Sequence, residues 1–367
     1  MSFWWRNKRT MKEVAVLIPA YKPNQALIRL LHALSKTGIG RIIVVNDGSG
    51  KEYDAIFKEA ETLPKVQVIF HQENQGKGKA LKTGFKYLLN HEPQCQYVIT
   101  ADADGQHQPD DILKIAKHMF RLKNEASGNE ALYIVLGIRD FSQKQVPFKS
   151  RFGNVLTRNV YYYFTGEELR DTQTGLRGFP RELLPWLLTI EGARYDYEMN
   201  MLALAKPKGV AIYQVPIKTI YEKGNPSSHF KPIKDSYYVY KIFFKFGASG
   251  LVSYGLDIGL FWFLCLIWRD DFPQLFILIA SIVSRVCSSL FNYFVNLYMV
   301  FGQGAAFPMV KYYLLALVVM LTSAGATQGL YVLTEGGEVI LKLLVDATLF
   351  VASFLGQKKW VFYKRAK

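Results

Sequence analysis

The last third of this 367-residue chain is too apolar for the surface of a water-soluble domain. From about residue 247 onward Leu, Val, Phe, Ile, Ala and Tyr dominate, in four apolar stretches at about 248–268, 275–301, 312–333 and 338–356. Each stretch supplies the roughly 20 residues that a helix needs to cross the hydrocarbon core of a bilayer. The sequence therefore predicts a soluble domain followed by an all-α membrane domain, 247–367, with four transmembrane helices.

The segment before these stretches, 229–246, carries apolar and basic residues at helical spacing. This pattern predicts an amphipathic juxtamembrane helix in the membrane interface, although an ordinary surface helix shares it. Four spans place both ends of the membrane domain on one side, together with Lys311, Lys358, Lys359, Lys364, Arg365 and Lys367. Because basic flanks favour the cytoplasmic side, we expect a multi-pass plasma-membrane protein whose soluble domain and both termini are cytoplasmic.

Polar side chains also fall in or near the predicted spans. They are Asp257, Arg285, Asn292, Asn296, Lys342 and Asp346. Polar groups at this depth are costly and often functional. Contacts between packed helices, or snorkelling to the interface, would explain them equally well.

The first two thirds of the chain alternate apolar strand patterns with helical ones. The strand patterns lie at Val14–Ile18, Arg41–Val45, Val66–Phe70 and Tyr97–Thr100. Strands that alternate with helices predict a mainly parallel, Rossmann-like α/β sheet, which we assign to 1–228. In such sheets ligands bind beyond the carboxyl ends of the strands, and this chain has a polar cluster at several of those ends.

Asp102-Ala103-Asp104 follows the last of these strand patterns and precedes a predicted helix. Two carboxylates in such a position can hold Mg²⁺ or Mn²⁺ together with phosphate oxygens, which neutralises a leaving nucleotide diphosphate. A lone Asp-x-Asp is commonly just a polar turn. The strand before it and the helix after it favour a nucleotide and metal site.

Two further clusters point to the same ligand. Asp47, at the end of the second strand, can accept hydrogen bonds from a base or a ribose, or can cap a glycine-containing turn. Pro19 and Tyr21, after the first strand, would form a wall of the base pocket. Lys77 and Lys79 lie in a glycine-rich loop before a helix, which favours anions, although the loop lacks Walker A spacing.

The formal net charge is +15. A basic chain attracts polyanions in general. Since no nucleic-acid-binding motif is visible, the predicted membrane domain favours anionic lipid and nucleotide as partners and excludes nucleic acid. Three scattered cysteines form no disulfide framework and have no zinc spacing.

Seven ordered motifs carry a family resemblance: VAVLIPAYKPN, VVNDGSG, NQGKGKALKTG, TADADGQHQPDD, GIRDF, DTQTGLRGFPRE and YDYEMN. Over about residues 12–230 the chain resembles the family 2 glycosyltransferases of GT-A fold, in the polyprenyl-phosphate branch that includes dolichol-phosphate mannosyltransferase. The chain departs from the family pattern at Lys22-Pro23, where Asn-Glu is common. It departs again at Asn46, where a second aspartate usually precedes Asp47.

The resemblance implies roles for the matching residues. Together with the loop lysines, the predicted nucleotide-sugar site comprises Pro19, Tyr21, Asp47, Lys77, Lys79, Asp102, Ala103 and Asp104. The expected metal ligands are Asp104 and Gln106, and Arg139 and Arg151 would hold a lipid phosphate. The expected catalytic residues are Asp102, Asp104, Asp171, Gln173 and Glu198.

The implied reaction is metal-dependent, inverting transfer of a sugar from a nucleotide-sugar, with a UDP-sugar favoured, to a polyprenyl phosphate such as undecaprenyl phosphate. The product would serve cell-envelope glycosylation. A lipid phosphate is already anionic and needs little or no general base, so positioning and charge neutralisation would carry the catalysis. Residues 247–367 resemble GtrA-like membrane proteins through SRVCSSLFNYFVN and QKKWVF. That resemblance implies an anchor, with lipid-sugar flipping as a further hypothesis.

Two alternatives remain open. A processive polysaccharide synthase also joins a GT-A domain to membrane helices, but this chain lacks the Q-x-x-R-W motif in its soluble domain. A membrane scaffold or lipid-sugar translocator could carry an inactive transferase domain, but the intact Asp102, Asp104 and Arg139 argue against it. The sequence also leaves a homo-oligomer open.

Overall fold

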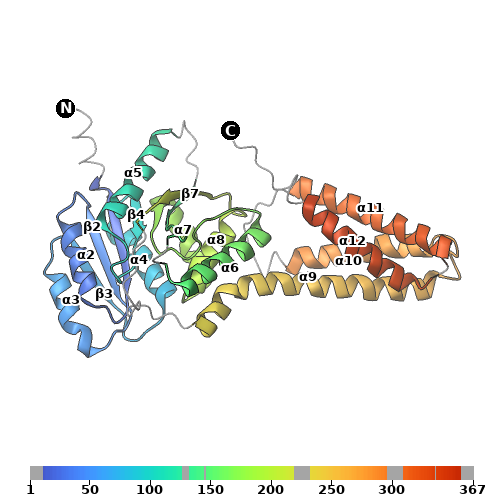
Figure 1. Ribbon diagram of the computed structural model, residues 1–367, viewed down its shortest axis with the longest axis horizontal. Helices are drawn as coiled ribbons and strands as arrows, with labels where there is room; N and C mark the ends of the chain where they lie inside the picture. The colour runs from blue at the N-terminus through green and yellow to red at the C-terminus, as the bar shows by residue number, and fades with distance from the viewer. Residues whose placement is uncertain are drawn as a thin grey trace. The chain divides into compact units, whose positions relative to one another are not determined.

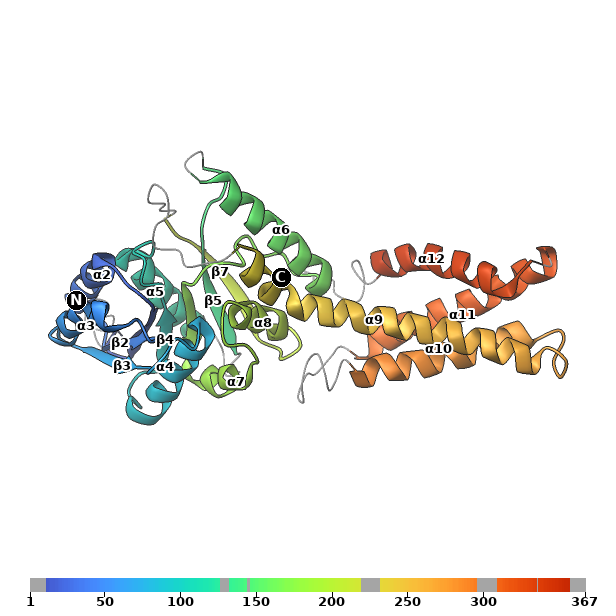
Figure 2. The same ribbon diagram turned by 90° about the horizontal axis from the view of Figure 1, so that it is seen from below.

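The computed structural model describes residues 11–125, 132–143, 146–218, 232–295, 309–334 and 336–356. The chain divides into two compact units, Met1–Lys241 and Ile242–Lys367. Figures 1 and 2 show an α/β unit at the N-terminal end and a helical unit at the C-terminal end.

The N-terminal unit is built on one seven-stranded sheet with the order β3-β2-β1-β4-β6-β5-β7. Its strands are β1 (Val14–Ala20), β2 (Arg41–Asn46), β3 (Val66–Phe70), β4 (Tyr97–Thr100), β5 (Tyr133–Ile138), β6 (Arg177–Pro180) and β7 (Ala211–Pro216). Strand β6 runs antiparallel to both neighbours, and the other strand pairs are parallel. The predicted mainly parallel α/β fold is confirmed.

Helices cover both faces of this sheet, as Figure 1 shows. They are α2 (Gln25–Ser35), α3 (Asp54–Glu61), α4 (Lys77–His91), α5 (Pro109–Glu125), α6 (Phe148–Thr165), α7 (Leu184–Thr189) and α8 (Asp196–Ala205), with short 3-10 helices at Lys51–Tyr53 and Arg181–Leu183. Helix α2 contacts α3 and α5, and helix α4 contacts α7 and α8. The central strand β1 is apolar along almost its whole length because both of its faces are covered.

The direction of each strand decides which loops meet. The parallel strands β1, β2, β4 and β5 end at the same edge of the sheet. The antiparallel strand β6 begins at that edge, since Thr100 at the end of β4 pairs with Arg177 at the start of β6. The loops after Ala20, Asn46, Thr100 and Ile138 therefore meet the loop that precedes Arg177.

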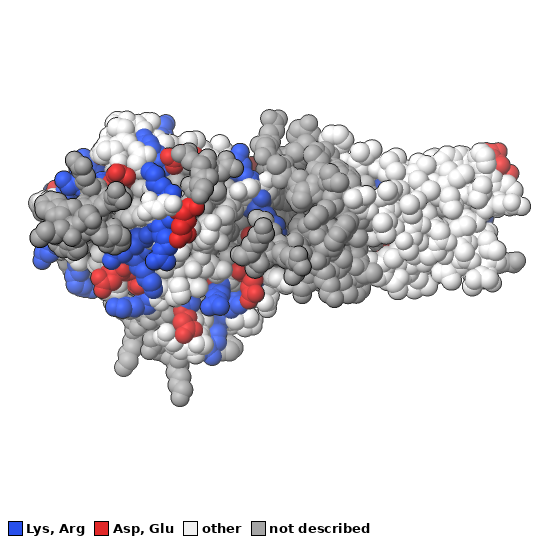
Figure 3. Space-filling model, turned by 90° about the horizontal axis from the view of Figure 1, so that it is seen from above, with Lys and Arg blue, Asp and Glu red and all other residues white. Residues whose placement is uncertain are grey.

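The C-terminal unit consists of helices α9 (Pro232–Trp268), α10 (Phe276–Val295), α11 (Met309–Thr334) and α12 (Glu338–Gly356). Within the described residues, Gly250–Trp268 and Ala316–Thr334 are long and apolar enough to span a membrane, and Phe276–Asn292 is a shorter apolar helix. Many large apolar side chains point outward, among them Leu251, Trp262 and Leu333. Figure 3 shows few charged side chains on the described surface of these helices. These features are those of a membrane-embedded unit.

The juxtamembrane segment is part of one continuous helix, since α9 runs unbroken from Pro232 through Trp268. The side chains of 232–247 lie outside the described residues, as do residues 219–231. The amphipathic helix at 229–246, the domain boundaries and the cytoplasmic orientation therefore stay predictions.

Four of the polar residues singled out in the spans form a buried ion-pair network. Arg285 Nη2 lies 3.2 Å from Asp257 Oδ2 and 2.7 Å from Asp346 Oδ2. Lys342 Nζ lies 3.6 Å from both of these carboxylates, and Ser323 donates a 2.6 Å hydrogen bond to Asp346. The network joins α9, α10, α11 and α12, and its two acids balance its two bases. Of the other two predicted polar residues, Asn292 is half-buried on α10 and Asn296 lies outside the described residues.

Candidate active site

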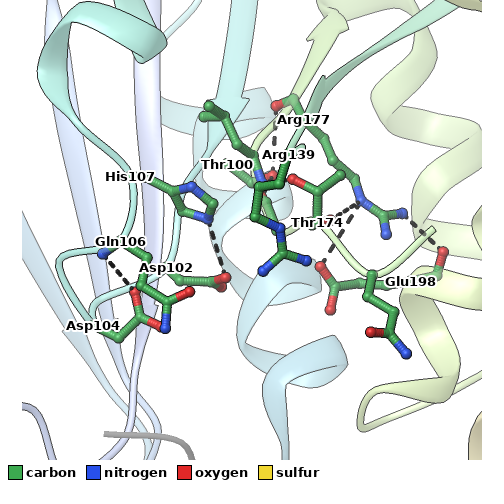
Figure 4. Close-up of polar contacts among 12 residues, drawn as sticks. Thr100, Asp102, Asp104, Gln106, His107, Arg139, Thr174, Arg177 and Glu198 are labelled. Atoms are coloured by element: carbon green, nitrogen blue, oxygen red, sulfur yellow. Dashed lines mark hydrogen bonds and ion pairs between the residues drawn. The ribbon is translucent and has the colours of Figure 1, made fainter. Parts of the chain in front are cut away.

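Asp102 lies just beyond the end of β4, at the edge of the sheet where the loops meet. Lys77 Nζ contacts its Oδ1 at 2.7 Å, and His107 Nε2 lies 3.2 Å from its Oδ2. Burial disfavours the charge on Asp102, but Lys77 and the His107 hydrogen bond outweigh it and hold the pKa of Asp102 well below its usual range. Asp102 is therefore a carboxylate at neutral pH. Figure 4 shows His107 directed at it.

A glycine lets the neighbouring loop approach Asp102 closely. A Cβ added at Gly175 would lie only 2.3 Å from Asp102 Oδ2, too near for any side chain. Thr100 fixes this loop by donating a 2.8 Å hydrogen bond to the Gly175 carbonyl. The loop leads directly into β6 and carries Arg177 to the site.

Glu198, on α8, completes this side of the site. Its Oε2 lies 2.9 Å from Lys77 Nζ, and its Oε1 lies 3.9 Å from Arg177 Nε. Arg177 is almost fully buried and donates to the backbone carbonyls of Thr174 and Glu198 at 2.9 Å and 2.8 Å. Burial lowers the pKa of Arg177, against the pull of Glu198 and Asp171. Glu198 is thus held by two cations and is not a free base.

Arg139, just beyond β5, forms a two-pronged ion pair with Asp171. Its Nε and Nη2 donate to the Asp171 carboxylate at 2.7 Å and 3.2 Å. Asp171 is completely buried, and it also accepts a 3.0 Å hydrogen bond from the backbone N–H of Gln173. The Arg139 side chain keeps 14% of its surface exposed. The pair therefore fixes the position of the Arg139 guanidinium, and part of the Arg139 side chain remains accessible to solvent.

The other predicted lipid-phosphate ligand, Arg151, has different partners. It lies on α6, and its guanidinium donates to the backbone carbonyls of Phe141, Ser142 and Gln143. It holds the loop after Arg139 in place, and phosphate binding by Arg151 stays a prediction.

The carboxylate of Asp47 accepts hydrogen bonds from other groups of the protein. It accepts from His71 Nδ1 at 2.8 Å and Asn74 Nδ2 at 3.0 Å. It also accepts from the backbone N–H groups of Gln75 at 2.9 Å and Gly76 at 2.8 Å. These four donors use the lone pairs that a carboxylate offers. In this structure Asp47 organises the loop before α4, and its predicted contact with the nucleotide stays a prediction.

Several backbone N–H groups of the glycine-rich loop before α4 already donate hydrogen bonds within the protein. Besides the two N–H groups taken by Asp47, the N–H of Lys79 donates to the Ala193 carbonyl at 3.0 Å. Lys79 itself is exposed. Any phosphate contact from this loop would therefore depend mainly on lysine side chains.

Comparison with known proteins assigns each unit of the chain to a family. Residues 15–184 match glycosyl transferase family 2, and residues 245–362 match the GtrA/DPMS transmembrane domain. An uncharacterized protein of Methanocaldococcus jannaschii is 32% identical over 60% of this chain and 87% of its own length. The UDP-N-acetylglucosamine–dolichyl-phosphate N-acetylglucosaminyltransferase of Methanococcus voltae is 31% identical over 57% of this chain and 86% of its own length. The chain belongs to glycosyl transferase family 2.

A more distant likeness is found among solved structures. Glucosyl-3-phosphoglycerate synthase from Mycobacterium tuberculosis, in complex with Mg²⁺ and uridine diphosphate, is 14% identical. It aligns with a TM-score of 0.47 over 65% of this chain and 81% of that one.

The Asp-x-Asp motif of this glycosyltransferase suits a metal ion that arrives with the nucleotide. Within the described part of the chain, no three His, Cys, Asp or Glu side chains converge as in an all-protein metal site. Mg²⁺ is usually held by one or two carboxylates together with phosphate oxygens and water. Asp104 fits this role, because it makes no ion pair with any described residue and its Oδ1 accepts only the 3.0 Å hydrogen bond from the N–H of Gln106. Burial, and then the charge of Asp102, raise the pKa of Asp104, which a bound cation would reverse.

The structure gathers the predicted residues at one edge of the sheet. Figure 4 shows Asp102, Asp104, Gln106, Arg139 and Glu198 together. The other predicted site residues lie as follows: half-buried Ala103 within the motif, Pro19 and Tyr21 at the end of β1, and exposed Gln173 with Nε2 donating to Thr157 at 3.2 Å. Their contacts with substrate stay predictions.

Sequence reasoning offered Arg177 only as one possible ion-pair partner of Asp171 and Glu198, and it missed His71. The signal for Arg177 was an arginine at the start of the otherwise apolar strand β6, because a buried arginine needs a partner. For His71 the sequence held no signal, since its partners Asp47 and Thr83 come from other elements.

Proposed function

We propose that this glycosyltransferase moves a sugar from a nucleotide-sugar to a polyprenyl phosphate at the cytoplasmic face of a membrane. The observation that carries the proposal is the fixed Arg139 cation near the Asp102–Asp104 pair (Figure 4). A guanidinium held in a fixed position suits the phosphate of the acceptor, and the aspartates suit the diphosphate of the donor. The similarity to an enzyme named for dolichyl phosphate supports the same assignment. A UDP-sugar as donor and undecaprenyl phosphate as acceptor are the specific forms we favour.

The acceptor needs no strong base. A phosphate monoester is already anionic near neutral pH, so its oxygen can attack the anomeric carbon directly. The two buried carboxylates agree with this, since Asp171 is engaged by Arg139 and Glu198 by Lys77. We therefore assign them to holding cations rather than to moving protons, and we expect a single displacement with inversion at the anomeric carbon. A bound Mg²⁺ or Mn²⁺ would neutralise the charge on the leaving diphosphate.

We further propose that the membrane unit anchors the enzyme and presents the acceptor phosphate to the site. Its match to the GtrA/DPMS transmembrane domain supports an anchoring role. Flipping of the lipid-linked product stays a secondary hypothesis. The buried network of α9, α10, α11 and α12 does not favour it over anchoring, because its charges already balance.

The test is release of nucleotide diphosphate by the purified full chain. The protein is incubated with Mg²⁺ or Mn²⁺, a short polyprenyl phosphate and each nucleotide-sugar in turn. We expect release that requires both lipid phosphate and divalent cation, disappears in Asp104→Asn and persists in Asp110→Asn. Asp110 is a matched control because it is an exposed acid in the first turn of α5. Full release without lipid phosphate, or undiminished release in Asp104→Asn, would contradict the proposal.

A further inference from the structure

Lys77 occupies the position between two carboxylates of the site. Its ammonium lies 2.7 Å from Asp102 Oδ1 and 2.9 Å from Glu198 Oε2. These two ion pairs hold the pKa of Lys77 above its ordinary value although burial opposes the charge. The sequence assigns this lysine to phosphate, yet in this structure its ammonium is bound to Glu198 and to Asp102, the first acid of the Asp-x-Asp motif.

Because of the contact with Lys77, the two aspartates of the Asp-x-Asp motif have different partners. Both oxygens of Asp102 are engaged, one by Lys77 and the other by His107. Asp104 has no such ion pair among the described residues and accepts from the N–H of Gln106. A divalent cation can therefore reach Asp104 directly but must compete with Lys77 for Asp102.

The backbone of Lys77 is fixed, so only its side chain can move. Gly76 begins α4 with φ of 101°, and a Cβ there would lie 2.5 Å from the Ala193 carbonyl oxygen. A Cβ on Gly78 would lie 2.5 Å from the Cβ of Tyr197. The start of α4 thus packs tightly against the start of α8, whereas the Lys77 and Asp102 side chains are 17% and 28% exposed. The two side chains are therefore partly accessible to solvent, while the start of the helix that carries Lys77 is held in place.

If the Lys77 ammonium moved away, Asp102 and Glu198 would each keep another partner. Glu198 would keep Arg177, whose Nε lies 3.9 Å from Oε1. Asp102 would keep the imidazole of His107 on one oxygen and free the other. An isolated buried charge is very costly, and these remaining partners remove that cost.

We propose that Lys77 is a resident counter-cation that withholds Asp102 from divalent metal until a nucleotide diphosphate draws its ammonium away. The proposal rests on the proposed function in one respect, namely that this site takes a nucleotide-sugar. The ammonium exchanges two carboxylates for the diphosphate oxygens, and Asp102 becomes available beside Asp104. Nucleotide and divalent cation therefore bind cooperatively, and Lys77 is the residue that couples them.

Binding of Mn²⁺ to the purified full chain tests this without any turnover. Free Mn²⁺ is measured by its electron paramagnetic resonance signal, with and without UDP, and with GDP as a second nucleotide. In the wild type we expect nucleotide to tighten Mn²⁺ binding by about fivefold or more, within the usual range for coupled sites. In Lys77→Met we expect Mn²⁺ to bind about tenfold more tightly than in the wild type when nucleotide is absent. The further gain from nucleotide should then be smaller than in the wild type, because the phosphate oxygens still supply metal ligands but no longer displace an ammonium from Asp102.

Two variants control for charge and folding. Lys86→Met removes an exposed lysine from the same helix and should leave Mn²⁺ binding unchanged. Lys77→Arg keeps a cation between the carboxylates and should keep weak Mn²⁺ binding without nucleotide, even if Lys77→Met is poorly folded. Circular dichroism of each variant monitors the fold.

The outcomes separate the two proposals. Equal Mn²⁺ affinity of wild type and a folded Lys77→Met without nucleotide overturns the role of Lys77, even if Asp104-dependent nucleotide release is seen. Tight Mn²⁺ binding by Lys77→Arg without nucleotide overturns it as well. If no protein binds Mn²⁺ with or without nucleotide, the role of Lys77 falls together with the metal dependence of the proposed reaction.

Discussion

Replacing Asp346 by asparagine tests the energetics of the buried ion-pair network. Asp346 balances Arg285 at 2.7 Å and Lys342 at 3.6 Å, and Lys342 is completely buried. Asparagine keeps the shape and can still accept from Ser323, but it leaves two cations facing Asp257 alone. Breaking a buried ion pair by removing one partner costs about 3–5 kcal/mol. We expect the lower end of this range, because the Arg285 side chain is 23% exposed and can partly turn away.

A double variant distinguishes charge imbalance from simple loss of contacts. Asp346→Asn combined with Lys342→Met removes one acid and one base, and leaves Arg285 with Asp257 at 3.2 Å. Replacement of buried ion pairs by apolar side chains is often neutral. We therefore expect the double variant to be more stable than Asp346→Asn alone, which is a coupling between neighbouring residues.

The cysteines allow each unit to be followed separately. Cys265 is fully buried in the helical unit and Cys95 in the α/β unit, while Cys287 is exposed and is replaced by serine for the assay. Maleimide labelling of Cys265 over increasing SDS in mixed micelles reports opening of the helices, and Cys95 serves as the internal control. A destabilisation below about 1 kcal/mol in Asp346→Asn, the ordinary effect of a point mutation, would refute the reasoning. So would a double variant whose loss equals the sum of the two single losses.

Three further predictions concern the active site. Gly175→Ala places a Cβ 2.3 Å from the Asp102 carboxylate, so we expect sugar transfer to fall about tenfold or more, which corresponds to a change of about 1.4 kcal/mol in the barrier; unaltered transfer would contradict the close approach. Asp171→Asn removes the charge that fixes Arg139, so the KM for lipid phosphate should rise more than the KM for donor, and equal changes would speak against a role in the acceptor site. The pKa of Asp102 is lowered and that of Lys77 is raised, so the stabilisation by their pair is complete between the unfolded-state pKa values of about 4 and about 10, and it declines progressively as the pH moves beyond them toward the folded-state values. The stability difference between wild type and Lys77→Met, measured by denaturation across pH, should shrink progressively below about pH 4, because Asp102 of the unfolded chain takes up a proton there while Asp102 of the folded protein stays ionised; a constant difference would contradict this prediction.

The fold was predictable because its signals are local. An apolar run between polar clusters marks a strand wherever it occurs, and β1 to β4 lie where the sequence places them. Parallel strands then bring Asp47 and Asp102 to one edge without further information. The sequence therefore predicts which residues meet at that edge, but it does not determine their partners.

The partners depend on contacts between distant segments. His71 reaches Asp47 across β2 and β3, and it takes a lone pair that sequence reasoning assigned to the nucleotide. Lys77 reaches Glu198, 121 positions along the chain, only because the starts of α4 and α8 pack together. The spacing of residues in the sequence does not predict this contact. It predicts each helix separately, whereas the contact depends on how α4 and α8 pack against each other.

Strand β6 is the element that links the aspartates after β4 to the arginine after β5. The strands β1, β2 and β4 end at this edge with the residues assigned to the donor, whereas β5 ends there with Arg139. Between β4 and β5 the sheet holds β6, which runs in the opposite direction and so presents its start, not its end. Its leading loop places Asp171 against Arg139 and brings Gly175 against Asp102. Because β6 begins at this edge, the loop that precedes it carries both Asp171 and Gly175, and this one loop therefore connects the Arg139 cation to the Asp102 carboxylate.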